Sequence, residues 1–164
     1  AEVILRIRAA GKIVIGRIHG KAVGGGVGLA AACDYALATR YASVRLSELA
    51  VGIGPFVIGP AVERKIGLAA FSQMALSPTE WQSAEWAKQR GLYQEAFEST
   101  QQLDEYIVYF TSQLMQYNPQ ALTALKEVFW QGTGHWPALL KERAAISGSL
   151  VLSNFTREAI SRFS

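Results

Sequence analysis

Three consecutive glycines, Gly24, Gly25 and Gly26, are the residues whose type and spacing best suit chemistry. A glycine inside a helix costs on the order of 1 kcal/mol relative to alanine, so such a run needs a physical reason. Without β-carbons, the Gly25 amide can face a ligand directly, and a following helix adds unpaired N–H groups and a positive dipole end. The run predicts a site for an oxyanion or a phosphate. The alternative is tight packing of a helix against a sheet.

Glu48 is the candidate for proton chemistry. It lies in an apolar stretch between a predicted short strand and the loop at residues 52–55. If it is buried, desolvation would favour its neutral form and bring its pKa closer to the range useful for general acid and base catalysis. A surface or helix-capping glutamate would have the same sequence context. Asp34, which follows the predicted glycine-led helix, is expected to be structural.

Other catalytic and binding motifs are absent from the sequence. Position 29, where a dinucleotide motif beginning at Gly24 would need its last glycine, is leucine. Gly20–Lys21 lacks the upstream glycine and the following Ser or Thr of a phosphate-binding loop, and there is no Gly-x-Ser-x-Gly elbow. His19 and His135 are far apart without a carboxylate cluster, so we predict no metal site, and a turn position for His19.

The elements that must position these residues are predicted from the hydrophobic pattern. Residues 12–18 are rich in β-branched side chains, which predicts a strand that runs into a turn at His19–Gly20. The small apolar run at residues 27–33 predicts a buried helix, and strand character returns at residues 35–39 and 43–46. Strand, turn, helix and strand within about 30 residues are typical of an α/β layer.

Helices are predicted from Gly59 onward. Their ends carry the usual cap residues: Ser83 with Gly91, Asn118 with Pro119, and either Asn154 or Thr156 at the start of the last helix. An apolar stripe at helical spacing predicts core or a subunit interface: Leu103, Ile107, Phe110, Leu114 and Tyr117.

Composition limits the class of protein. The chain has 164 residues, 50% of them hydrophobic, which suits one globular domain or a large part of one. Its 16 Lys and Arg are scattered and its net charge is +3, which argues against a nucleic-acid partner. No membrane span or secretion signal is recognisable, and the single cysteine, Cys33, favours a reducing compartment, so we expect a soluble, cytoplasmic protein. The chain begins at Ala1, without a start methionine, and we expect the N-terminal part to be missing.

The sequence resembles the enoyl-CoA hydratase/isomerase (crotonase) family. Residues 19–34, HGKAVGGGVGLAAACD, carry the resemblance together with LSE at 46–48 and GIGP at 52–55. The likeness covers residues 12–93 well and the tail at 118–163 loosely. The Gly-Val-Gly-Leu turn with a retained glutamate is similar to bacterial members of the methylglutaconyl-CoA hydratase type.

The resemblance implies an α/β fold, a crotonase (ClpP/crotonase-like) spiral of ββα units. Residues 1–100 would form the C-terminal part of that spiral and residues 101–164 a helical trimerisation region. The family forms trimers and often hexamers, so a homotrimer or a dimer of trimers is expected. Its substrates are acyl-CoA thioesters, and no separate cofactor is needed because coenzyme A is part of the substrate.

The resemblance also assigns roles to individual residues. The Gly25 amide would hold the thioester oxygen, while the second amide and most coenzyme A contacts come from an earlier segment of the family's chain. Glu48 matches the second of two glutamates that hydratases use, and Gly28 stands where the first would be. The substrate-binding residues would be Ala22, Val23, Gly24, Gly28, Pro55 and Phe56.

The expected activity is reversible addition of water to a 2-enoyl-CoA, with Glu48 as the acid and base. Because Gly28 cannot hold water or a proton, two alternatives stay open: a double-bond isomerase and a non-catalytic acyl-CoA-binding protein. Phe56 and Val57 would either reshape the acyl pocket or only pack their loop.

Overall fold

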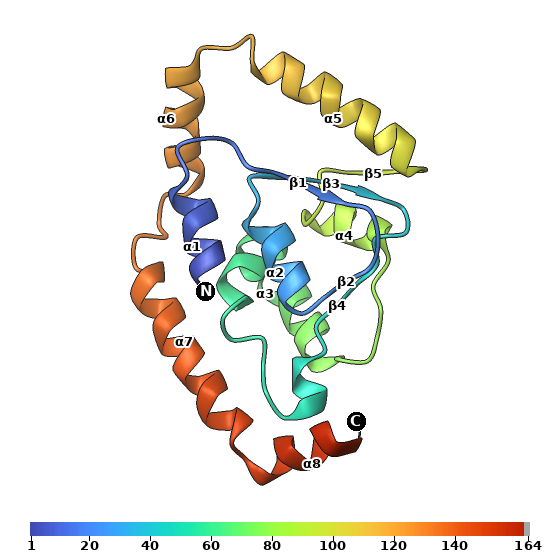
Figure 1. The fold of residues 1–164 in the computed structure, drawn as a ribbon, viewed down its shortest axis with the longest axis vertical. Helices are drawn as coiled ribbons and strands as arrows, with labels where there is room; N and C mark the ends of the chain where they lie inside the picture. The colour runs from blue at the N-terminus through green and yellow to red at the C-terminus, as the bar shows by residue number, and fades with distance from the viewer. Residues whose placement is uncertain (163–164) are drawn as a thin grey trace.

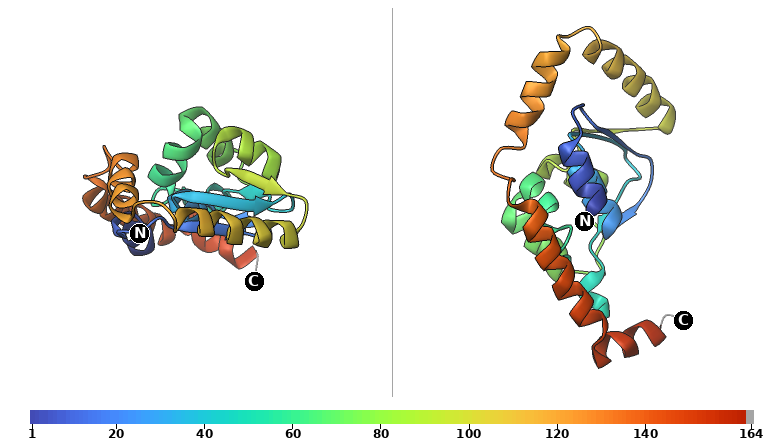
Figure 2. Two further views of the ribbon diagram at one scale, coloured as in Figure 1. Left: turned by 90° about the horizontal axis from the view of Figure 1, so that it is seen from above. Right: turned by 60° about the vertical axis from the view of Figure 1, so that its left-hand side comes forward.

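The computed structural model describes residues 1–162; Phe163 and Ser164, the end of the predicted helical region, lie outside the described residues. A mixed α/β core is bordered by C-terminal helices that curve around it (Figures 1 and 2). The elements are, in chain order, α1 (Glu2–Ala9), β1 (Ile15–Ile18), β2 (Ala22–Val23), α2 (Gly25–Ala32), β3 (Tyr35–Thr39), β4 (Val44–Arg45), the 3-10 helix η1 (Glu48–Val51), α3 (Gly59–Leu76), α4 (Ala84–Arg90), β5 (Glu95–Phe97), α5 (Thr100–Leu114), α6 (Pro119–Phe129), α7 (Trp136–Val151) and α8 (Asn154–Arg162). None of the described helices is long and apolar enough to cross a bilayer.

Two small parallel sheets form the core. Strands β1, β3 and β5 make the first, in the order β1-β3-β5, with Ile15 opposite Tyr35 and Thr39 opposite Phe97. Strands β2 and β4 make the second, with Val23 opposite Arg45. Parallel strands need a crossover, and α2 supplies one between β1 and β3. The predicted strand at 35–39 is confirmed, and those at 12–18 and 43–46 are confirmed over shorter lengths.

Helix α2 begins earlier than the sequence predicted. The expected helix was residues 27–33, whereas α2 includes Gly25 and Gly26 and ends at Ala32. Gly24 is its N-cap, with φ 55° and ψ −114°, and the Gly24 carbonyl accepts hydrogen bonds from the Val27 and Gly28 amides at 3.0 and 3.2 Å. The left-handed φ of Gly24 turns the chain from β2 into α2, so the glycine run forms the turn and the first helical residues together.

The predicted helix ends are confirmed. The Ser83 hydroxyl accepts a hydrogen bond from the Trp86 amide at 3.0 Å, and Gly91 ends α4 with φ 93°. The Asn118 side chain accepts one from the Gln120 amide at 2.9 Å at the start of α6. The last helix begins at Asn154, one of the two predicted positions, and its cap is Ser153, whose hydroxyl accepts a hydrogen bond from the Thr156 amide at 3.2 Å. Each cap satisfies a backbone group that the helix leaves unpaired.

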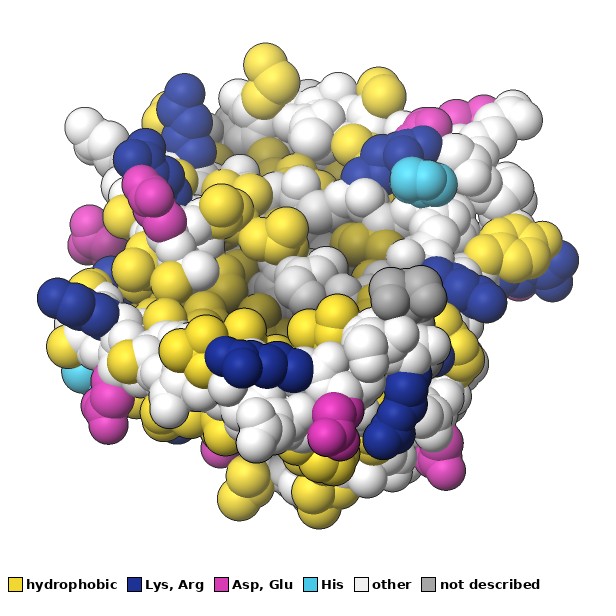
Figure 3. Space-filling model, turned by 60° about the horizontal axis from the view of Figure 1, so that its bottom comes forward, with side chains coloured by type: hydrophobic (Ala, Val, Ile, Leu, Met, Phe, Trp, Pro, Cys, Tyr) yellow, Lys and Arg dark blue, Asp and Glu magenta, His cyan; other side chains and the backbone are white. Residues whose placement is uncertain are grey.

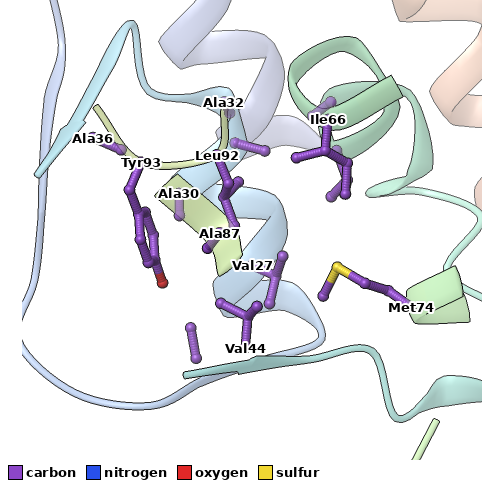
Figure 4. Close-up of a cluster of buried hydrophobic side chains, with 14 of the residues drawn as sticks. Val27, Ala30, Ala32, Ala36, Val44, Ile66, Met74, Ala87, Leu92 and Tyr93 are labelled. Atoms are coloured by element: carbon purple, nitrogen blue, oxygen red, sulfur yellow. The ribbon is translucent and has the colours of Figure 1, made fainter. Parts of the chain in front are cut away.

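Helix α2 lies in the centre of the hydrophobic core. Val27, Ala30 and Ala32 are buried and pack with residues of α3, α4 and β4, including Met74 and Val44 (Figure 4). The small side chains let neighbouring backbones approach closely, and the contacts of α2 with α1, α3 and β2 hold its first turn in place. Rigid support of this kind is what a preorganised site requires.

A buried ion pair fastens the N-terminal segment and α6 to the end of α2. Asp34 and Lys126 meet at 2.9 Å with side chains that are 1% and 4% exposed. Asp34 also accepts hydrogen bonds from the Val14 amide and the Trp130 indole, both at 2.7 Å. The Lys126 ammonium donates to the Ile7 carbonyl at 2.8 Å. The structural role expected for Asp34 is confirmed.

The predicted apolar stripe is core at one end only. Leu103 is fully buried, and Phe110 stacks on Tyr35 of β3 with ring centroids 4.4 Å apart. Tyr117 at the other end is 55% exposed. Helix α5 therefore packs on the core from Leu103 to Phe110, and the stripe beyond the end of the helix is exposed. The division at residue 100 into a spiral core and a trimerisation region stays a prediction.

Candidate active site

The glycine run places unpaired amides at the N-terminus of α2. Gly24 is the N-cap, and Gly25 and Gly26 are the first two helical residues. Within residues 1–162 neither the Gly25 nor the Gly26 amide has a backbone acceptor, as the first turn of a helix requires. A β-carbon built on Gly25 would meet no described atom within 4 Å. An anionic oxygen can therefore approach Gly25, and the helix dipole favours its charge.

The carboxyl group of Glu48 lies against the same turn. Glu48 is the first residue of η1, which follows β4. Its Oε1 atom is 2.5 Å from the position that a β-carbon on Gly24 would occupy. Gly24 is thus a glycine both because of its left-handed φ and because Glu48 approaches it closely. The structure brings together the carboxylate and the amide-bearing turn, which are about 20 residues apart in sequence.

Burial raises the pKa of Glu48 above its ordinary value, and a hydrogen bond with its own backbone lowers the pKa by a smaller amount. The Oε2 atom is buried and has no hydrogen-bond partner among the described residues. An unpaired buried carboxyl oxygen is costly, so a group that exchanges a hydrogen bond or a proton with Oε2 would be favoured. The lone carboxylate is suited to proton transfer.

Gly28 lies one helical turn beyond Gly24 and is also buried. A β-carbon on Gly28 would collide with the Ile58 side chain, 2.6 Å from its Cβ atom and nearer still to its Cγ2 atom. Ile58 is the N-cap of α3. The predicted contact of Gly28 with substrate stays a prediction; what the structure places beside Gly28 is an apolar side chain.

The loop between η1 and α3 carries the other predicted pocket residues. The Phe56 ring folds back over Gly54, with Cζ 2.7 Å from the position of a β-carbon there, and the Phe56 carbonyl accepts a hydrogen bond from Arg143 of α7 at 3.4 Å. Pro55 and Val57 are half-buried beside it. These contacts pack Phe56 within its loop, and its predicted contact with substrate stays a prediction. In β2, Ala22 is buried and Val23 is 38% exposed.

Helix α8 supports η1, a relationship that sequence reasoning missed. A β-carbon on Gly52, directly after η1, would meet Phe155 and Thr156 of α8 at 2.5 and 2.7 Å. Thr156 is fully buried, whereas Phe155 is 62% exposed. The face at this end of the molecule is hollowed, and hydrophobic side chains gather around the hollow (Figure 3). The signal available in the sequence was the glycine at position 52, which in the structure has φ 82°.

A separate hollow between α3 and α7 has a volume of about 460 Å³ and is lined by Arg64, Trp136 and Arg143 among others. Neither Gly25 nor Glu48 borders this hollow. In residues 1–162, no group of three His, Cys, Asp or Glu side chains is arranged to hold a metal ion. The glycine turn with Glu48 remains the candidate site for acid–base chemistry.

Comparisons with known proteins show which family the chain belongs to. Residues 1–159 match the family model of enoyl-CoA hydratase/isomerase. The 2,3-dehydroadipyl-CoA hydratase of Escherichia coli (strain K12) is 35% identical over 127 residues, which are 77% of this chain and 49% of that protein. The peroxisomal Delta(3,5)-Delta(2,4)-dienoyl-CoA isomerase of Arabidopsis thaliana is 31% identical over 129 residues, 76% of this chain and 45% of that protein. The chain spans about half the length of these two relatives.

Solved structures show the same fold. An enoyl-CoA hydratase from Mycobacterium avium superposes with a TM-score of 0.91 at 28% identity, covering 99% of this chain and 63% of that one. An enoyl-CoA hydratase from Bacillus halodurans superposes with a TM-score of 0.87 at 24% identity, covering 97% and 64%. The predicted α/β crotonase fold is confirmed.

Proposed function

Because the chain belongs to the enoyl-CoA hydratase/isomerase family, we propose that its protein adds water reversibly to a 2-enoyl-CoA, using the Gly25 amide and the Glu48 carboxyl group. The observation that carries this proposal is the position of Glu48 Oε1, 2.5 Å from where a β-carbon on Gly24 would be. That position puts the proton-transferring group beside the turn that holds unpaired amides. A thioester bound there has both groups within reach.

The Gly25 amide stabilises the charge that develops on the thioester oxygen. When water adds to C3 of a 2-enoyl thioester, negative charge moves through C2 to that oxygen and forms an enolate. A backbone N–H aimed at the oxygen, together with the helix dipole of α2, lowers the energy of this state. The resemblance places the second donor in an earlier segment of the family's chain, so one amide of the pair is proposed here.

Glu48 transfers the proton in both halves of the reaction. Its carboxylate takes a proton from water as the water oxygen bonds to C3, and the resulting carboxylic acid gives that proton to C2 of the enolate. One H and one OH are added and the carboxylate is restored. The raised pKa of Glu48 supports this role. It makes the carboxylate a stronger base, and it brings the pKa of the carboxyl group closer to the working pH, where general acid and base catalysis is most efficient.

A double-bond isomerase is the second candidate. The same carboxylate would remove a proton from one carbon and return it to another, with no water involved. The Arabidopsis relative named as a dienoyl-CoA isomerase is the observation that favours it. An acyl-CoA-binding protein without chemistry is the third candidate, and the buried, unpaired Oε2 atom of Glu48 weighs against it.

Assembly into a homotrimer or a dimer of trimers is also proposed. The C-terminal helices expose large apolar side chains that a neighbouring copy would cover: Leu125, Val128, Phe129, Leu152, Phe155 and Ile160. A cytoplasmic location remains an expectation that rests on the single cysteine.

The test is a rate measurement on the whole protein that contains this chain. The loss of ultraviolet absorbance of a conjugated short-chain 2-enoyl-CoA reports hydration. Glu48→Gln should lower this rate by at least about 100-fold, the low end of general acid–base catalysis. Glu80→Gln, a change at an exposed carboxylate, should leave it unchanged. Equal rates for Glu48→Gln and wild type would exclude Glu48 as the acid and base, and conversion of a 3-enoyl-CoA without a 3-hydroxy product would favour the isomerase.

A further inference from the structure

Gly28 and Ile58 fit together as a small and a large residue across the first turn of α2. The position of a β-carbon on Gly28 is already filled by the Ile58 side chain, whose Cβ atom lies 2.6 Å away. The Ile58 α-carbon is 3.7 Å from that position, so backbone as well as side chain comes close. No side chain fits at position 28 unless Ile58 moves.

Glu48 and Ile58 approach α2 at its N-cap and one turn further on. Gly24 is the N-cap with non-helical backbone angles, and the Gly28 amide donates a hydrogen bond to the Gly24 carbonyl at 3.2 Å, so the two glycines are one turn apart. Glu48 lies against Gly24 and Ile58 against Gly28. One helical turn rises about 5.4 Å, so the two glycines that these side chains contact are about that far apart along α2.

We propose that Ile58 is a specificity-determining residue that forms an apolar wall beside C3 of the acyl group and limits branching there. The inference rests on the proposed function, in which Glu48 exchanges protons at water on C3 and at C2. Glu48 lies against Gly24, and Ile58 covers Gly28 one helical turn further along α2. A substituent on C3, the carbon at which Glu48 acts, is therefore close to Ile58. The substrate class is a 2-enoyl-CoA without a branch at C3.

The chemistry of this wall follows from its residue types. Ile58 is half-buried and packs against the hydrophobic core through one side, while Gly28 adds no polar atom beyond its backbone. A β-branched side chain at a helix N-cap has little rotamer freedom, so it presents a stiff surface to a ligand. Such a wall discriminates by size, and one extra methyl or methylene group in an apolar pocket changes discrimination by about 10- to 200-fold.

Binding of saturated thioesters tests the inference without turnover. The dissociation constants of butanoyl-CoA and 3-methylbutanoyl-CoA would be measured by calorimetry for the whole protein and for Ile58→Ala. Ile58→Ala should shift the ratio of the two constants in favour of the branched thioester by at least about tenfold. Ile18→Ala is the matched control, because Ile18 is also a half-buried isoleucine packed on the same core. Its ratio should stay at the wild-type value.

Other outcomes overturn the inference. An unchanged ratio in Ile58→Ala, or an equal shift in Ile18→Ala, means that Ile58 only packs the core, and the hydratase proposal is untouched by that result. If Ile58→Ala does not fold, Ile58→Val should give a smaller shift in the same direction, and no shift counts against the inference. Full turnover by Glu48→Gln would exclude the proposed mechanism while the binding ratio still reports on Ile58. If folded wild-type protein binds neither thioester, both proposals fail.

Discussion

The carboxyl group of Glu48 and the α-carbon of Gly24 approach each other so closely that no side chain fits between them. Glu48 Oε1 is 2.5 Å from the position of a β-carbon on Gly24. The contact joins η1 to the N-cap of α2, one residue before Gly25. The glycine that turns the chain into the helix also makes room for the carboxylate.

Gly24→Ala should damage both stability and activity. A non-glycine residue forced to the Gly24 backbone angles costs about 1–3 kcal/mol of unfolding free energy. The added methyl group would also displace Glu48, and a misplacement of about 1 Å can lower a rate by about 100-fold. Urea unfolding and the hydration rate are the measurements.

Gly26→Ala is the matched control for that change. A β-carbon on Gly26 would make an ordinary contact of 3.7 Å with Ala22, and the residue is helical. Alanine should therefore be accepted with stability close to or above that of wild type. Wild-type stability and rate in Gly24→Ala would contradict the contact between Glu48 and Gly24.

The raised pKa of Glu48 predicts how stability depends on pH. Burial favours the protonated carboxyl group in the folded state, so its pKa there lies above the unfolded value. The contribution of Glu48 to the free energy of unfolding is fully present below the pKa of the unfolded state, about 4.3. This contribution is lost as pH rises through the pKa of the folded state. Glu48→Gln removes the ionisation and should raise the melting temperature at neutral pH, with little effect below that unfolded pKa.

Thermal melts of wild type, Glu48→Gln and Glu80→Gln across this pH range provide the measurement. Glu80 is exposed, so Glu80→Gln should not change the dependence of melting temperature on pH. A melting temperature for Glu48→Gln equal to or below that of wild type at neutral pH would show that the buried carboxylate is not destabilising.

Local signals in the sequence predicted much of the fold. Features that depend only on neighbouring residues were predicted correctly. They are the β-branched strand before the glycines, the small apolar helix after them, and the helix caps at Ser83 and Asn118. The strands β2 and β5 were not predicted, because Ala22–Val23 and Glu95–Phe97 are too short for alternation to be recognised. They are strands because β2 pairs with β4 and β5 pairs with β3.

Contacts between distant residues could not be read from the sequence. Ile58 and Gly28 are 30 positions apart, and nothing near Gly28 indicates which side chain covers it. Lys126 is a buried lysine on an otherwise exposed helix, and its partner Asp34 lies far earlier in the chain. Glu48 was found from its apolar neighbourhood, but its contact with Gly24 required the fold.

The buried pair of Asp34 and Lys126 predicts a large loss of stability when one partner is removed. Lys126→Met would leave a buried carboxylate without its cation, which typically costs about 3–5 kcal/mol of unfolding free energy. Lys88→Met is the control, because the pair of Lys88 with Glu95 is solvent-exposed and should contribute less than about 1 kcal/mol. Equal losses in the two variants, measured by chemical unfolding, would contradict a structural role for the buried pair.

The fit of Gly28 against Ile58 predicts that changes at the two positions are coupled. Gly28→Ala alone puts a methyl group into the Ile58 side chain, and such overpacking costs about 1–3 kcal/mol of unfolding free energy. With Ile58→Gly in the same protein, the two clashing side-chain atoms are gone and the α-carbon of residue 58 is 3.7 Å away, so the methyl group has space. Alanine at position 28 also favours the helix over glycine by about 1 kcal/mol. The double variant should therefore be more stable than the sum of the single changes by about 0.5–3 kcal/mol. Unfolding free energies of the four proteins measure this coupling, and strictly additive losses would mean that Ile58 does not cover Gly28 in solution.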